Sequence, residues 1–74
     1  MSKVKLQCWI ARDEDGELNV GINRPKLDND KRWWINWGEF MGLPKSFFRE
    51  VTIHNSPQKV ETTIEIKKYG EEGA

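Results

Sequence analysis

The sequence predicts a mainly β fold: a small antiparallel curved sheet or open barrel of four to five strands, with one short helix plugging one end. Four segments in which apolar and polar residues alternate carry this prediction, because period-two alternation is typical of half-buried strands. Four Trp, three Phe and one Tyr favour a folded core although 32% of the residues are charged. Because a helix is expected, α+β is the alternative class.

The first two strands are predicted to form an antiparallel hairpin over residues 3–23. Between them, residues 13–16 read Asp-Glu-Asp-Gly, in which Gly16 can take the positive φ of a tight turn. The apolar face of this hairpin is expected to carry Val4, Leu6, Cys8, Ile10, Leu18, Val20 and Ile22.

The middle of the chain is predicted to contain a loop, a third strand and a short helix. Residues 24–32 are polar and include Pro25, which indicates a loop. Residues 33–37 alternate as a strand that could continue through Phe40, and they place Trp34 opposite Trp33 and Trp37. Residues 43–50 are expected to form one or two helical turns, with Pro44 at the first helical position.

The C-terminal part is predicted to be a second hairpin. Residues 51–54 are rich in β-branched side chains and are expected to form its short first strand. Residues 55–58 indicate a turn, and residues 60–66 alternate as a long final strand. We expect one domain over residues 1–69 and a disordered tail over residues 70–74.

Composition narrows the expected setting of the protein. Cys8 is a lone thiol, which fits a reducing compartment and excludes an internal disulfide or a cysteine-based zinc site. We expect no secretory leader and no membrane-spanning segment, and therefore a cytoplasmic location. Twelve basic residues balance twelve acidic ones, which argues against binding driven by net charge alone.

The residue types that carry catalysis are sparse. His54 and Cys8 could act together only if the fold brought them close, and buried cysteine beside strand-end histidine is the preferred interpretation. Glu61 and Glu65 are expected on a solvated strand face, and no phosphate-binding loop is visible. We therefore predict no enzyme, no cofactor and no small-molecule substrate.

Calcium binding is a further alternative, since alternating carboxylates can ligate this ion. Asp13 and Asp15 precede Gly16, and Asp28 and Asp30 follow on the next loop. Arg24, however, stands where an EF-hand loop needs its final glutamate. Turn chemistry explains the acidic residues, so we predict no metal site.

Several short motifs resemble a group of uncharacterised proteins of prophages and other mobile elements in gut bacteria. They are residues 9–18, Leu43-Pro44 followed by Phe47-Phe48 and Val51, then Ser56-Pro57 and Val60-Glu61. The resemblance covers most of the chain. It implies a bacterial cytoplasmic setting and a phage-related or accessory role, and it assigns no functional residues.

Basic and tryptophan residues in the middle of the chain are the best candidates for a contact surface. Our first hypothesis is a non-enzymatic protein-interaction module, and the alternative is single-stranded nucleic-acid binding through residues 24–37, with cations on phosphates and indoles on bases. A third use is self-association through the long final strand, if it lies at a sheet edge. The candidate contact residues are Trp9, Arg24, Lys26, Lys31, Arg32 and Trp34.

Overall fold

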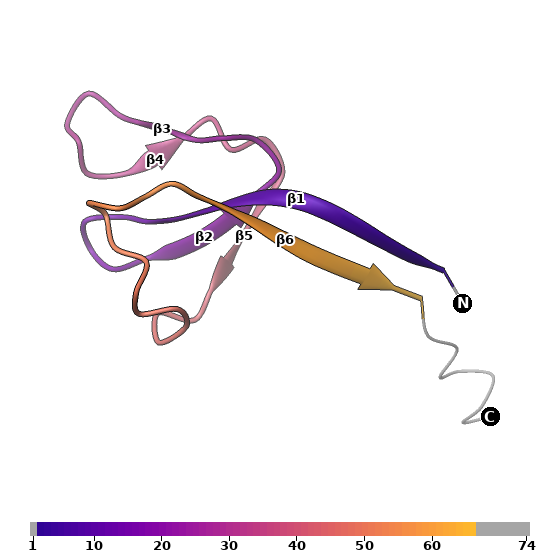
Figure 1. Cartoon of the computed structure of the whole chain (residues 1–74). Coiled ribbons are helices and arrows are strands. Elements are labelled where there is room, and N and C mark those ends of the chain that lie inside the picture. The colour runs from indigo at the N-terminus through magenta and orange to yellow at the C-terminus, as the bar shows by residue number, and fades with distance from the viewer. Residues whose placement is uncertain (1, 67–74) are drawn as a thin grey trace.

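Six strands form two antiparallel sheets in the computed structural model, which describes residues 2–66 (Figure 1). The larger sheet is open and has the order β5-β2-β1-β6, and the smaller one pairs β3 with β4. The mainly β prediction is confirmed. The predicted tail at residues 70–74 lies outside the described residues. The strands are β1 (Lys3–Arg12), β2 (Leu18–Gly21), β3 (Lys26–Leu27), β4 (Trp34–Ile35), β5 (Phe40–Leu43) and β6 (Gln58–Glu65).

Strand β1 is the longest and lies in the middle of the larger sheet. Its second half, Trp9–Arg12, pairs with β2 and confirms the predicted hairpin, although over fewer residues than expected. Its first half pairs with β6, from Lys3 opposite Glu65 to Cys8 opposite Val60. We call this two-stranded part, residues 3–8 and 60–65, the arm. Figure 1 shows the arm projecting away from the rest of the molecule. Including the arm, the molecule measures 51 × 22 × 17 Å.

The β1–β2 turn forms as its residue types predict. The backbone N–H of Asp13 donates to the carbonyl of Glu17 at 2.8 Å, and Gly16 adopts a φ of 94°. The Asp15 carboxylate accepts the N–H of Glu17 at 3.0 Å, which is the local bond that aspartate makes in turns. The turn thereby sets the register that places Leu18 opposite Arg12.

The two faces of the larger sheet are covered by different parts of the chain. On the apolar face, Val51 from the segment after β5 packs on Ile10 and Leu18 and forms the core. On the opposite face lie the buried side chains of Ala11 and Trp37. Trp37 fits closely over Gly21, where an added Cβ would meet the indole at 2.7 Å. Both faces of this part of the sheet are therefore covered, one by Val51 and the other by Trp37.

The predicted third strand is broken into two. Asn36 and Gly38 have positive φ angles of 67° and 69°, a conformation that ends an extended strand. The chain therefore leaves β4 after Ile35 and enters β5 at Phe40. β5 then joins the larger sheet beside β2. β4 instead pairs with β3, a strand that lies within the loop predicted at residues 24–32.

The predicted helix at residues 43–50 is absent, and this prediction was wrong. Leu43 ends β5, the N–H of Phe47 closes a turn onto the carbonyl of Pro44, and Phe48 adopts a φ of 48°. Phe47 and Phe48 are about half exposed, so the packing that so short a helix requires does not occur. The short strand expected at residues 51–54 is also missing, because residues 51 and 52 have no regular structure and a turn begins at Ile53.

Over residues 2–66, the structure contains no helix with the length and apolar character needed to cross a membrane.

Candidate interaction surfaces

Trp9 lies on the face of β1 opposite the apolar core residues, as the alternation predicts. The guanidinium carbon of Arg24 is 5.1 Å from the centre of its ring, and the Nζ of Lys59 is 6.0 Å away. Cations at these distances are attracted to the ring face. The indole is half-buried and already carries two cations of its own chain.

Trp34 is also held by its own chain. Its indole Nε1 donates to the carbonyl of Arg12 at 3.0 Å, and its backbone N–H donates to the Asp13 carboxylate at 3.0 Å. These bonds fasten the β3–β4 hairpin to the β1–β2 turn. The neighbouring Trp33 is 42% exposed, so in this segment it is the better placed indole for an external contact.

The four predicted basic contact residues lie on or next to the β3–β4 hairpin. Arg24 contacts Trp9, and Arg32 lies 3.7 Å from the carboxylate of Glu14 in an exposed ion pair. Lys26 in β3 pairs with Ile35 in β4, and Lys31 lies in a turn with a φ of 58°. The structure therefore brings these cations to one hairpin, with Arg24 and Arg32 already engaged within the chain.

The acidic turn beside this hairpin has an unusual carboxyl group at Asp13. Burial raises the pKa of Asp13 above its ordinary value of 3.8, and the nearby carboxylates of Asp15, Glu17 and Asp28 act in the same direction. The hydrogen bond from the N–H of Trp34 lowers the pKa but does not reverse the shift. Negative charge at this turn weakens the positive field of the hairpin.

Three aspartates of the turn and the next loop, Asp13, Asp15 and Asp28, accept hydrogen bonds from backbone N–H groups. Asp28 accepts the N–H groups of Arg32 and Trp33 at 3.1 and 3.4 Å, and Asp13 accepts that of Trp34. Within residues 2–66, no group of three or more histidine, cysteine or acidic side chains is arranged to hold a metal ion.

Cys8 and His54 line different hollows of the molecule. The Cys8 thiol is buried on the apolar face of β1 and lines a groove there. His54 lines a second hollow, together with Lys31, Trp34 and Ser56.

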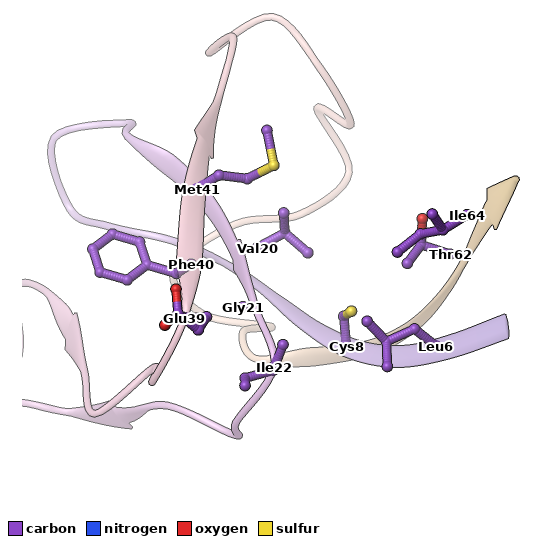
Figure 2. Close-up of a pocket in the computed structure, with 10 residues that line it drawn as sticks. All are labelled: Leu6, Cys8, Val20, Gly21, Ile22, Glu39, Phe40, Met41, Thr62 and Ile64. Carbon is purple, nitrogen blue, oxygen red and sulfur yellow. The ribbon is translucent and has the colours of Figure 1, made fainter. Parts of the chain in front are cut away.

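The groove beside Cys8 is lined mainly by apolar side chains. It has a volume of about 390 Å³ and lies between the arm and the β2–β5 pair (Figure 2). In Figure 2, Met41 and Phe40 point to opposite sides of β5. Met41 and Ile64 are 61% and 55% exposed, so much apolar surface remains in contact with water. The groove is lined by Leu6, Cys8, Val20, Gly21, Ile22, Glu39, Phe40, Met41, Thr62 and Ile64.

The sequence assigns Leu6 and Ile64 to the apolar face but does not reveal that they stay exposed. The segment that forms the core reaches only the end of the sheet around Ile10 and Leu18. One signal was available in the sequence, since the alternation runs from Val4 to Ile10 before the turn but only from Leu18 to Ile22 after it. A strand this much longer than its hairpin partner leaves a part that the hairpin cannot cover.

Comparison of the chain with protein-family models, with curated proteins and with solved structures gave no match. The origin in a phage or mobile element therefore stays a prediction from the resemblance.

Proposed function

We propose that this chain is a small non-enzymatic protein-interaction module that adds an extended segment of a partner as a new strand along β6. The proposal is supported by one combination: an eight-residue strand at the sheet edge with an exposed apolar face beside it. In strand addition, backbone hydrogen bonds supply affinity and alternate side chains supply specificity.

The side chains of β6 define the chemistry of the partner strand. Val60, Thr62 and Ile64 lie on the apolar face, so apolar side chains should stand opposite them. Glu61 and Glu65 lie on the other face, and a basic residue opposite either one would be favoured. The expected partner is therefore an extended segment that alternates apolar residues with lysine, arginine or threonine.

The surface suggested by the sequence supports this function less well. Trp9 lies beneath Arg24 and Lys59, and Trp34 uses both its indole and backbone N–H groups within the chain. An indole must give up such partners before it can contact another molecule. The contact that we propose accordingly lies at β6 and its apolar face.

A titration followed by amide NMR tests this function. The labelled chain, kept dilute, is mixed with a synthetic peptide as long as β6 that alternates valine with threonine and lysine. We expect shifts at the amides of Lys59, Glu61 and Thr63, because bonding to a new strand changes their environment. The matched control is the same peptide with proline at its centre, which lacks a donor and should bind more weakly. Unchanged amides along β6 would contradict the proposal.

Single-stranded nucleic-acid binding is a second candidate, favoured by the exposed indole of Trp33, which lies between the Lys31 turn and β4. Exposed aromatic rings stack on bases, and neighbouring cations contact phosphates. Tryptophan fluorescence with a short mixed-sequence strand measures this binding. Affinity should fall roughly tenfold between about 50 and 200 mM salt if about three phosphates are contacted. An affinity that does not change with salt concentration would exclude nucleic-acid binding through phosphate contacts.

A further inference from the structure

The outer edge of β6 has features that suit pairing with another strand. Within the described chain, β6 ends the larger sheet and pairs only with β1. The N–H of Ile66 donates to the carbonyl of Ser2, so the backbone groups of the even-numbered residues face β1. Strand alternation then turns the N–H and C=O groups of Lys59, Glu61 and Thr63 toward the outer edge.

Within residues 2–66, the outer edge of β6 lacks three of the features that shield edge strands in natural proteins. These features are a proline, a bulge and a charge that points inward. Proline is absent from β6, because Pro57 precedes its first residue, and the pairing with β1 runs unbroken from Gln58 to Glu65. On the apolar face, β6 carries Val60, Thr62 and Ile64 rather than a charge.

The sequence of β6 is complementary to itself in an antiparallel arrangement centred on Thr62. Two copies related by a two-fold axis through this residue place Lys59 of one copy opposite Glu65 of the other. The same axis places Val60 opposite Ile64, so the apolar residues pair on one face and the opposite charges pair on the other. Cross-strand pairs of both kinds stabilise antiparallel sheets.

The neighbouring registers are disfavoured by like charges. Both copies must keep their apolar faces on the same side of the sheet. The two-fold axis must therefore pass through a residue, and the two nearest alternatives to Thr62 are Glu61 and Thr63. Centring on Glu61 places this carboxylate opposite itself. Centring on Thr63 places Glu61 opposite Glu65. Of these three registers, only the one centred on Thr62 opposes unlike charges and avoids both clashes.

We infer that the strand added to β6 is β6 of a second copy, paired antiparallel about Thr62. This inference rests on the strand addition proposed above and names its partner. The result is one sheet of eight strands, four from each copy, with both apolar faces on the same side. Pairing with Val60 also covers part of Ile64, which is 55% exposed in the single chain.

Charge reversal at the paired positions tests the register. Sedimentation equilibrium from low micromolar to millimolar concentration should show dimers of the parent chain. Lys59→Glu places a second carboxylate opposite Glu65, and Glu65→Lys places two lysines opposite each other, so each variant alone should dimerise roughly tenfold more weakly. Because Glu65→Lys also breaks the ion pair of Glu65 with Lys3 of its own chain at 3.4 Å, the mixture of the two variants is the decisive measurement. An equimolar mixture of the two variants restores both unlike pairs and should dimerise as the parent does.

Two controls keep this test specific. Lys26→Glu makes the same charge change on β3 and should leave dimerisation unchanged. Thermal unfolding followed by circular dichroism verifies that each variant is folded. The inference is overturned if the single variants dimerise as well as the parent, or if the mixture stays monomeric. If the parent is monomeric but the synthetic peptide still shifts the amides of β6, self-pairing fails while the proposed function stands. Failure of both measurements rejects the proposed function as well.

Discussion

Arg12 uses all five N–H groups of its guanidinium on backbone carbonyls. Its Nε donates to Val51 at 2.6 Å, and its two terminal nitrogens donate to carbonyls of the β1–β2 turn and of the segment after β5. These further acceptors are Gly16, Lys45, Phe47 and Phe48, at 2.8, 3.1, 2.8 and 3.2 Å. One planar side chain thus fixes the path of a segment that lacks regular structure, because guanidinium presents its donors in a rigid fork.

Replacing this arginine should loosen the segment even when its charge is kept. Lysine has three donors on a single atom, so Arg12→Lys leaves at least two of the five carbonyls without their partner. We expect a loss of about 2 kcal/mol in the free energy of unfolding, measured by urea denaturation. Lys45→Arg, which alters a nearby exposed side chain, is the control and should be neutral. A stability of Arg12→Lys equal to that of the parent would show that the carbonyl bonds contribute little.

Asp13 should limit stability at neutral pH. Because its pKa is raised in the folded state, the folded chain binds this proton more tightly than the unfolded chain does. Ionisation therefore costs stability once the pH exceeds the folded-state pKa, and the cost disappears as the pH falls below 3.8. Asp13→Asn keeps an oxygen acceptor for the N–H of Trp34 and removes the charge. Its thermal midpoint should exceed that of the parent at pH 7, and the difference should shrink on acidification.

The matched variant Asp13→Ala separates charge from hydrogen bonding. It removes the acceptor as well and should be less stable than Asp13→Asn at every pH, by about 1 kcal/mol. A parent that is more stable than Asp13→Asn at pH 7 would reverse the assigned sign.

At the scale of elements, the fit between β2 and the β3–β5 region depends on a missing side chain. A Cβ on Gly21 would lie 2.7 Å from Trp37, 3.0 Å from the Cβ of Phe40 and 3.1 Å from the carbonyl of Glu39. Trp37 in turn donates its Nε1 to the carbonyl of Trp34 and stacks on Phe40 with ring centres 6.0 Å apart. The absence of a side chain at Gly21 therefore allows Trp37 to cover this face of the sheet and allows β5 to begin beside β2 at Phe40.

Gly21→Ala should therefore lower stability by about 1–3 kcal/mol, since the backbone and a packed indole must move apart. Gly42→Ala is the matched control in the neighbouring strand, where the nearest atom to an added Cβ is Oδ1 of Asn19 at 3.4 Å. Urea denaturation of both variants, with tryptophan fluorescence, measures the difference. Equal stabilities would mean that Trp37 can shift without cost.

At the scale of the whole molecule, local alternation predicted the positions of the strands well, but it did not predict which segments of the chain contact one another. β1, β2 and β6 were identified because a two-residue period is a property of each segment alone. The helix at residues 43–50 was predicted from Pro44 and helical spacing, but those carbonyls bind Arg12 instead. Backbone acceptors have no side-chain signature, so the role of Arg12 could not be found in the sequence.

The candidate surface was predictable to a similar degree. Alternation assigns Val4, Leu6 and Ile64 to one face, but it does not say which segment covers that face. The sequence also predicted that the long final strand could mediate self-association if it lay at a sheet edge. Its position beside β1 rather than inside the sheet follows from long-range pairing, which local patterns do not specify.

The pairing of β1 with β6 has a consequence for synthesis on the ribosome. Lys3 pairs with Glu65, so the first strand of the described chain completes its ladder only after the last one has been made. Contacts this distant in sequence are slow to form, because a long loop must close before they stabilise anything. During translation, the first half of β1 therefore leaves the exit tunnel with unpaired backbone N–H and C=O groups along the edge that β6 later occupies.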